Sequence, residues 1–256
     1  DGVIVDKARI VASLKTLTYL LDQGAKVIVM SHFGRPKGKP NQEYSLKFIA
    51  DFLGETLLEN VLFADDDQVT GPITKEMVAN LKSGELLLLQ NTRFRKEEEE
   101  NAPNFSKELA SLGDIFINDA FGTAHRAHSS TAGIASYLPS GLGFLLKKEV
   151  DILSKVMENP ERPFVAILGG SKVSDKIGVI ENLLNKVDTL IIGGAMMFTF
   201  YRAIGLNTGS SMVEEDKIEL AKGILAKGKE LGVAILLPVD VVVADRFAND
   251  AQFKVV

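Results

Sequence analysis

Residues 7–38 read KARIVASLKTLTYLLDQGAKVIVMSHFGRPKG, and this stretch decides the fold class. Its first half predicts an amphipathic helix over Lys7–Asp22, because apolar residues recur at helical spacing and Gly24 follows where helices often end. The residues that line the apolar face are Ile10, Leu14, Leu17 and Leu21. The second half predicts a buried strand over Lys26–Met30, followed by a polar loop. A helix joined closely to a short buried strand is typical of α/β folds.

Strand-length apolar runs and amphipathic stretches continue to alternate along the chain. Further buried strands are predicted at Val61–Phe63, Leu86–Leu89, Ile115–Asn118, Phe164–Leu168, Thr189–Ile192 and Ala234–Leu237. Further helices are predicted at Ser45–Leu58, Lys75–Leu81, Phe105–Leu112, Lys176–Asn185 and Glu214–Leu231. Because strands and helices alternate, we expect parallel sheets with right-handed crossovers and helices on both sheet faces. The predicted fold class is therefore α/β.

A long helical stretch at Phe144–Glu158 separates the two halves of the chain. It is followed by Asn159-Pro160, a common helix stop, and then by a new strand. We therefore expect two domains, residues 1–143 and 160–256, joined by an interdomain helix over residues 144–159. The acidic run Glu97–Glu100 is predicted to be a solvated loop or helix start.

Composition excludes several classes of protein. The chain has 256 residues, 46% hydrophobic and 25% charged, as in globular proteins. No apolar run approaches the ~18 residues needed to span a membrane, and no signal peptide is expected. The net charge of −5 disfavours a nucleic-acid partner, which usually calls for a basic surface. With no cysteine there is no disulfide, thiolate nucleophile or cysteine metal site, and a cytoplasmic location fits.

Cations gather in the loops that follow the predicted strands of the first half. Ligands of open parallel sheets bind beyond the carboxyl ends of strands. The loops there read SHFGRPKG (31–38), NTRFR (91–95) and FGTAHRAH (121–128). Because arginine forks carboxylate and phosphate oxygens, these loops predict a site for a small anion that carries both groups. His125 and His128 either contact such a ligand or are structural, whereas Lys37 and Arg95 are predicted to be solvated.

Glycine-rich turns follow the predicted strands of the second half. The turn GGSK (169–172) leads into a helix, so its backbone N–H groups and lysine could face phosphates. The pair GG (193–194) either shares that role or is a tight turn beneath helix packing. Neither G-x-x-x-x-G-K-[ST] nor G-x-G-x-x-G occurs here. The spacing alone predicts a phosphate site and leaves a nucleotide open.

At these loops the sequence closely resembles the phosphoglycerate kinase family. The matching strings are SHFGRP (31–36), NTRF (91–94), NDAFGTAHRAHSS (118–130), LGGSKVSDK (168–176), IGGAMMFTF (192–200) and LPVD (237–240). They are collinear and cover nearly all of the chain. The resemblance implies a glycolytic kinase that closes about a hinge and is a cytoplasmic monomer. Its two Rossmann-like domains would bind 3-phosphoglycerate or 1,3-bisphosphoglycerate and Mg²⁺ with ADP or ATP.

The resemblance also implies residue roles by position. The residues that match the triose-acid site are Arg9, His32, Phe33, Gly34, Arg35, Arg93 and Arg126. The residues that match the nucleotide site are Gly170, Ser171, Lys172, Lys176, Gly193, Gly194 and Ala195. Catalysis is assigned to Arg9, Lys172 and Lys176, because phosphoryl transfer through a loose transition state needs cations and positioning but no protein nucleophile.

The chain departs from the family pattern at both ends. The family opens with an RVDFNVP-like strand that holds substrate, and it continues beyond Val256 with an aspartate for Mg²⁺. The second domain is therefore expected to be incomplete, and no metal ligand is expected in this chain. A protein limited to these residues is expected to lack normal kinase activity. Two alternatives remain, a nicotinamide-dependent oxidoreductase, disfavoured by the missing G-x-G-x-x-G, and a non-catalytic anion-binding module.

Overall fold

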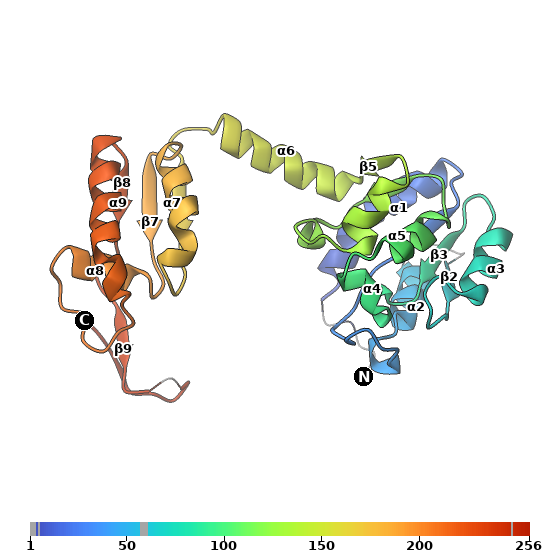
Figure 1. Ribbon diagram of the computed structural model, residues 1–256, viewed down its shortest axis with the longest axis horizontal. Coiled ribbons are helices and arrows are strands. Elements are labelled where there is room, and N and C mark those ends of the chain that lie inside the picture. The colour runs from blue at the N-terminus through green and yellow to red at the C-terminus, as the bar shows by residue number, and fades with distance from the viewer. Residues whose placement is uncertain (1–3, 5, 57–60, 247) are drawn as a thin grey trace. The chain divides into compact units, whose positions relative to one another are not determined.

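The computed structural model describes residues 4, 6–56, 61–246 and 248–256, and its elements are labelled in Figure 1. The chain divides into two compact units, residues 1–153 and 154–256. The division falls inside α6 (Phe144–Glu158), the helix that the sequence predicts between two domains. None of the helices described is both long and apolar enough to cross a membrane.

The first unit alternates helices with short strands. Its main elements are α1 (Ala8–Asp22), β1 (Val27–Val29), α2 (Lys47–Thr56), β2 (Val61–Ala64), α3 (Pro72–Asn80), β3 (Leu86–Leu89), α4 (Lys96–Glu99), α5 (Pro103–Ala110), β4 (Phe116–Asn118) and β5 (Ser140–Leu142). Its short helical turns are η1 (Gln42–Tyr44), η2 (Thr92–Phe94), η3 (Phe121–Thr123), η4 (Ser129–Gly133) and η5 (Ile134–Ser136). These bounds confirm the predicted strands of this half. Residues 57 and 58 of the predicted helix over Ser45–Leu58 lie outside the described residues.

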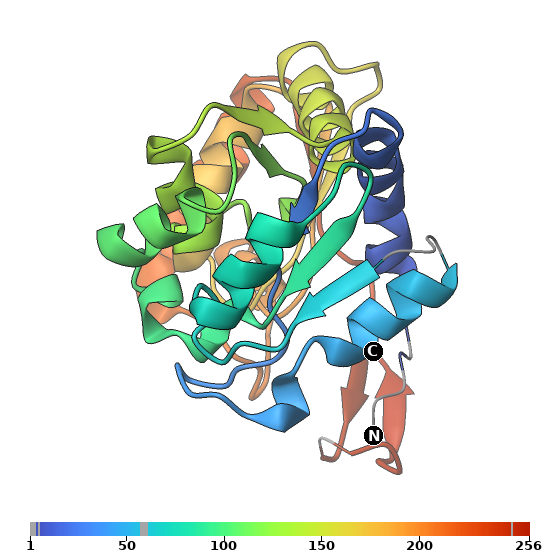
Figure 2. The ribbon, with the colours of Figure 1, turned by 90° about the vertical axis from the view of Figure 1, so that its right-hand side faces the viewer.

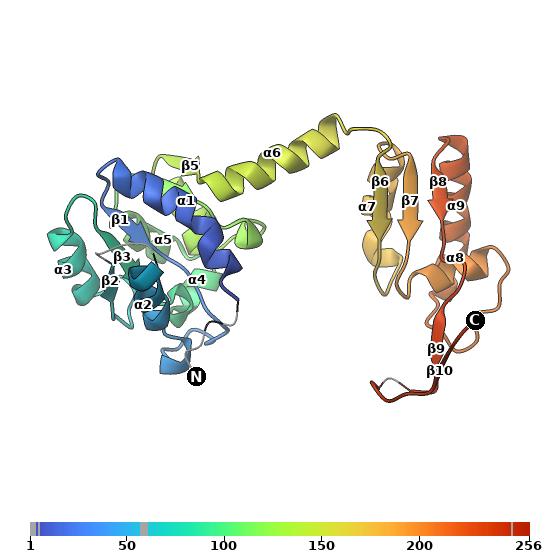
Figure 3. The ribbon, with the colours of Figure 1, turned by 180° about the vertical axis from the view of Figure 1, so that it is seen from behind.

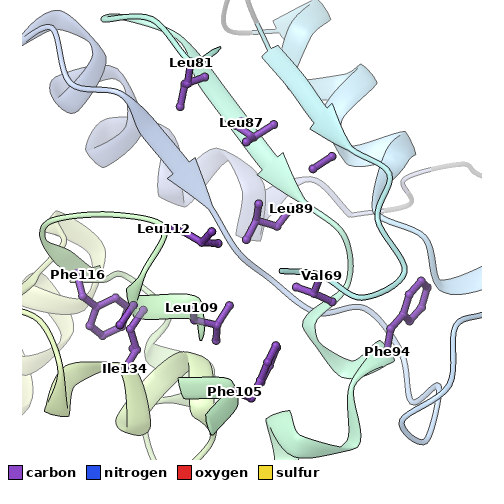
Figure 4. Close-up of a cluster of buried hydrophobic side chains, with 12 residues drawn as sticks. Val69, Leu81, Leu87, Leu89, Phe94, Phe105, Leu109, Leu112, Phe116 and Ile134 are labelled. Atoms are coloured by element: carbon purple, nitrogen blue, oxygen red, sulfur yellow. The ribbon is translucent and has the colours of Figure 1, made fainter. Parts of the chain in front are cut away.

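The sheet of the first unit is parallel, in the order β1-β3-β2. All four leucines of the central strand β3 are buried, because helices cover both sheet faces. Figure 2 shows α1 and α2 on one side of the sheet and α3 and α5 on the other. Leu86 and Leu88 pack toward α1 and α2, whereas Leu87 and Leu89 pack into the cluster of Figure 4 with Phe105 of α5. The predicted two-sided covering is confirmed for this unit.

β4 pairs in parallel with β5, so that Phe116 lies opposite Ser140. The sequence does not predict β5, because its three residues, Ser-Gly-Leu, form no apolar run. β4 also precedes the loop that carries His125, Arg126 and His128.

The second unit contains a second parallel sheet. Its elements after α6 are β6 (Val165–Leu168), η6 (Ser174–Lys176), α7 (Ile177–Leu184), β7 (Thr189–Ile192), α8 (Met197–Ala203), η7 (Glu215–Lys217), α9 (Ile218–Glu230), β8 (Ala234–Leu236), β9 (Val242–Ala244) and β10 (Phe253–Val255). β6, β7 and β8 are neighbours in that order and run parallel (Figure 3). The sequence does not predict α8 or the antiparallel pair β9 and β10. Parallel α/β architecture is nevertheless confirmed in both units.

Within the described part of the second unit, helices cover only one face of the sheet. Ala166 and Leu168 of β6 pack with residues of α7, α8 and α9. On the opposite face Val165 is half exposed and Ile167 is 77% exposed. Because β6, β7 and β8 follow one another in a single direction, right-handed crossovers place their connecting helices on the same face. The expectation of helices on both faces is therefore wrong for these residues.

Candidate functional site

The loops after β1 and β3 leave the same edge of the sheet, because the two strands are parallel neighbours. Asn91, which is fully buried, ties the loops together. Its Nδ2 donates hydrogen bonds to the carbonyl oxygens of Phe33, at 2.7 Å, and Tyr44, at 2.8 Å. Its Oδ1 accepts one from the backbone N–H of Arg93, at 3.1 Å. Arg93 is thereby held beside the loop that carries His32.

The Arg93 side chain is buried, with only 5% of its surface exposed. Its Nη1 donates to the carbonyl oxygen of Gly34 at 3.0 Å. Its Nε lies 3.2 Å from Oε1 of Glu99 but without hydrogen-bond geometry, and its Nη2 has no partner among the described residues. Buried charged donors without partners are unfavourable, and a bound carboxylate or phosphate would satisfy them. Arg93 therefore has the features of a residue that binds an anion.

The lowered pKa of His32 reflects burial and the cations of the two other loops. Burial is the largest cause that lowers its pKa, from 6.5 to about 4, and the positive charges of Arg93, Arg126 and His128 lower it further. The carboxylate of Glu99 opposes them. His32, Arg93, Arg126 and His128 are here called the cationic basin. Arg93 donates to the Gly34 carbonyl in the loop of His32, and Ser130, in the loop that follows Arg126 and His128, donates to Glu98, five residues from Arg93. A basin of this charge suits a small anion.

The lowered pKa of His32 predicts a dependence of stability on pH. In the unfolded chain His32 binds a proton near pH 6.5, whereas in the folded protein it does so only near pH 4. Between these values the unfolded state binds more protons, so the free energy of unfolding should decrease as the pH falls from 6.5 to 4. His32→Gln should remove part of this decrease. Urea denaturation at several pH values measures it, and equal pH slopes in the two proteins would contradict the expectation.

Other residues predicted for the triose-acid site lie apart from these contacts. Arg9, in the first turn of α1, and Arg35 are exposed, and their side chains make no hydrogen bond or ion pair with residues that the structure describes. The Phe33 ring packs edge-on against Tyr44 and Phe48, at centroid distances of 6.1 and 5.4 Å. Gly34 contributes its carbonyl to Arg93. The roles of Arg9, Phe33 and Arg35 in ligand binding stay predictions.

The predicted solvation of Arg95 is wrong, whereas Lys37 is exposed as expected. Only 23% of the Arg95 side chain is exposed, and its guanidinium pairs with Glu97 at 3.1 Å and Glu108 at 3.4 Å. These carboxylates, with Thr70 and Lys75, also line a pocket of about 650 Å³ in the first unit. The four residues of the cationic basin do not line this pocket, so the size of the pocket does not identify it as the predicted anion site. The sequence could not reveal the pairing with Glu108, because Glu108 belongs to a different helix.

In the second unit the two glycine turns meet. The N–H of Gly193 donates to the Leu168 carbonyl at 2.8 Å, and that of Met196 donates to the Gly170 carbonyl at 2.9 Å. Gly194 has φ +66°, and a Cβ atom there would stand 2.7 Å from the Gly170 nitrogen. Cε of Lys176 and Sδ of Met196 would each lie 3.7 Å from a Cβ at Gly170. Gly170, Lys176 and Gly194 are therefore gathered in one place.

Glu214 supports this turn from outside it. Its carboxylate accepts hydrogen bonds from the backbone N–H groups of Val173, at 2.5 Å, and Ser174, at 3.2 Å, and from Oγ of Ser174, at 2.6 Å. Burial raises the pKa of Glu214, but these hydrogen bonds outweigh it and lower the pKa overall. The N–H groups that begin the helical segment are thus occupied by a protein carboxylate. A phosphate group would therefore bind the residues that precede these N–H groups, Ser171 and Lys172, which are exposed.

Sequence reasoning missed Asn91, as the link between two loops, and Glu214. The run NTRF contained Asn91, but its two carbonyl partners lie 58 and 47 residues away. Glu214 lies 41 residues from Val173, and no local pattern marks it. In the described ranges, no cluster of three or more His, Asp or Glu side chains is arranged to hold a metal ion. Ala195 immediately precedes Met196 at the start of α8 and is partly buried.

Comparison with known proteins shows the family of the chain. The family model described as phosphoglycerate kinase matches residues 1–256. Among curated relatives, the phosphoglycerate kinase of Finegoldia magna is 56% identical over 256 residues, which is 100% of this chain and 65% of that protein. That of Clostridium botulinum (Loch Maree, type A3) is 56% identical over 253 residues, 98% of this chain and 64% of that protein.

Solved structures of phosphoglycerate kinases have a similar fold. The protein from Coxiella burnetii superposes with a TM-score of 0.84 at 42% identity, covering 100% of this chain and 64% of that one. The protein from Pyrococcus horikoshii OT3 gives a TM-score of 0.78 at 32% identity, covering 99% and 64%. The chain thus spans 64% of the length of each of these two structures.

Proposed function

The chain belongs to the phosphoglycerate kinase family, and from this premise we propose that the protein transfers a phosphoryl group reversibly from 1,3-bisphosphoglycerate to ADP, giving 3-phosphoglycerate and ATP. The chain spans 65% of the length of the first relative, so the activity of the whole protein is an inference from the family. The observation that carries the substrate half is the buried Arg93 guanidinium, whose Nη2 lacks a partner among the described residues.

We propose that the cationic basin binds the triose acid. 3-Phosphoglycerate carries a carboxylate and a phosphate, both of which arginine binds through paired N–H donors. Arg93 and Arg126 would supply these donors, and His32 would donate or accept a single hydrogen bond. With its pKa lowered to about 4, His32 is neutral at pH 7 when the basin is empty. Arg9 and Arg35 join this proposal on the strength of sequence position.

The glycine turns of the second unit are proposed to bind the nucleotide. A side chain at Gly194 would collide with the Gly170 backbone, so that position requires glycine. Backbone without side chains allows a ligand to approach closely. Lys172 and Lys176 would neutralise phosphate charge, with Gly193 and Ala195 on the adenosine side. Together with Arg9, the two lysines would stabilise the transferring phosphoryl group, so that catalysis rests on positioning and charge.

Mg²⁺ is proposed to accompany the nucleotide phosphates, whose charge it neutralises when bound. The described residues do not fit a metal centre of their own, since no group of three His, Asp or Glu side chains is placed to form one. No step is therefore assigned to a metal held by this chain. Family membership also supports a cytoplasmic monomer without nucleic-acid or membrane partners.

Titration with 3-phosphoglycerate tests the proposal. Calorimetry should detect saturable binding, and NMR should show that the pKa of His32 rises on binding, because a negative ligand favours the imidazolium. A protein of the full family length should then form ATP in a coupled assay with 1,3-bisphosphoglycerate and Mg-ADP. Absence of 3-phosphoglycerate binding to that protein would contradict the proposal. Binding of NADH instead would favour the oxidoreductase alternative, and anion binding without turnover would favour a non-catalytic module.

A further inference from the structure

Glu98 differs from the other members of the acidic run Glu97–Glu100. Its side chain is 1% exposed, whereas Glu99 and Glu100 are exposed to solvent. The prediction that this run is solvated is therefore wrong at Glu98. Placing a carboxylate in the interior is unfavourable unless its oxygens find partners, so a buried glutamate calls for a structural or functional reason.

The hydrogen-bond partner of the Glu98 carboxylate belongs to the loop that carries the basin cations. Oγ of Ser130 donates to Oε1 at 2.5 Å, and the Ser130 N–H donates to Oε2 at 3.0 Å. Nδ1 of His128 lies 3.9 Å from Oε1. The Thr92 hydroxyl lies near the carboxylate but makes no hydrogen bond among the described residues. No lysine or arginine pairs with Glu98 in the described chain, so this is not an ordinary salt bridge.

The electrostatics agree with this geometry. Burial is the largest influence on Glu98 and raises its pKa, while the hydrogen bonds from Ser130 and the charge of His128 act in the opposite direction. The Glu98 carboxylate therefore depends on the hydrogen bonds from Ser130 for its stabilisation, and Glu98 and Ser130 hold each other in place.

Hydrogen bonds within residues 126–131 link this loop internally, so a bond that fixes Ser130 also restrains the backbone of Arg126. Oγ1 of Thr131 donates to the Arg126 carbonyl at 2.7 Å, and the His128 N–H donates to Oγ1 of Thr131 at 3.1 Å. Ser129 adds a bond from its Oγ to the Glu97 carbonyl at 3.0 Å. Residues 126–131 are thus fastened to α4 as one piece, and two of them, Arg126 and His128, act on His32.

We propose that Glu98 is a positioning residue of the cationic basin: by holding Ser130 and facing His128, its carboxylate fixes the loop of residues 126–131 that carries Arg126 and His128. The proposal rests on the proposed function, since the basin is the triose-acid site there. Glu98 need not touch the ligand. It acts through the loop of residues 126–131, and its loss should loosen the basin without removing any basin residue.

Glu98→Gln tests this role with little change of shape. In the ligand-free protein the pKa of His32, followed by NMR, should rise from about 4 toward 6.5, because Arg126 and His128 move away. A purely electrostatic effect has the opposite sign, since deleting a negative charge lowers a histidine pKa. The dissociation constant for 3-phosphoglycerate should increase on the order of 10-fold, as expected when one charge-assisted hydrogen bond is weakened, while that for Mg-ATP stays unchanged.

Two further variants complete the test. Glu100→Gln makes the same change at an exposed glutamate and should alter neither His32 nor 3-phosphoglycerate binding. Ser130→Ala removes one of the two hydrogen bonds to Glu98 and should raise the His32 pKa by a smaller amount. It also replaces Glu98→Gln as the test if that variant does not fold.

A folded Glu98→Gln whose His32 pKa is unchanged or lower would overturn the proposal, as would Ser130→Ala with an unchanged His32 if Glu98→Gln does not fold. Failure of the unmodified protein to bind 3-phosphoglycerate would instead contradict the proposed function. The His32 measurement needs no ligand and still decides whether Glu98 positions the basin.

Discussion

Arg93→Ala is expected to weaken 3-phosphoglycerate binding by about 1.5–3 kcal/mol for each charge-assisted hydrogen bond lost, which is roughly 10- to 150-fold. The reason is that Nη2 of Arg93 is buried without a partner in the described chain, so a bound anion would supply one at a site already desolvated. The loss should also raise the pKa of His32, because one of the positive charges that lower it is removed. Burial, the largest cause, should keep that pKa below 6.5.

Calorimetry with 3-phosphoglycerate and NMR of His32 measure the two effects. Arg95→Ala is the matched control, since Arg95 lies two residues away and already pairs with Glu97 and Glu108. It should alter stability but leave the affinity within about a factor of two, as expected for positions outside a binding site. An Arg93→Ala protein that folds and binds like Arg95→Ala would show that Arg93 is structural.

Gly194→Ala is expected to destabilise the second unit strongly. The φ of +66° is unfavourable for alanine by roughly 1–2 kcal/mol. The added methyl would also stand 2.7 Å from the nitrogen and 2.8 Å from the oxygen of Gly170, and such overpacking typically costs about 1–3 kcal/mol more. Relief would require the two glycine turns to separate, so Mg-ATP binding should weaken as well.

Gly193→Ala is the control from the same turn. Apart from its two chain neighbours, no described residue comes within 4 Å of a Cβ at Gly193, and its φ is not in the left-handed region, so this change should be tolerated. Hydrogen exchange resolves the second unit from the first and is preferable to a single melting temperature for a chain of two units. Equal protection of β6 and β7 in the two variants would contradict the steric argument.

Elements with a clear apolar period or a long buried run could be predicted from the sequence. The range predicted for β3, Leu86–Leu89, agrees with the structure, because four consecutive leucines between turn residues have one interpretation. The helix α8 (Met197–Ala203) was not predictable in this way. Its residues MFTFYRA are aromatic and apolar on several sides, so they show no helical period, and the glycines before them read as a turn.

The candidate site likewise has features that could be predicted from the sequence and features that could not. Its cations could be found from the sequence, because the carboxyl ends of parallel strands meet at one edge and the residues after them must gather there. Pairings between distant segments could not be found from the sequence. Glu98 and Ser130 are 32 residues apart, and nothing near Glu98 distinguishes it from Glu99 or Glu100.

The sequence by itself therefore determined the parallel α/β architecture, the loops that carry Arg93, Arg126 and His32, and the glycine turns. These features depend on residues close together in the chain, whose periodicity and spacing are local properties. Only the tertiary structure decided that Arg93 is buried with a donor that lacks a partner among the described residues, that His32 has a pKa of about 4, and that Glu98 turns inward. Burial and charge proximity arise when separate segments pack together, and no single segment contains that information.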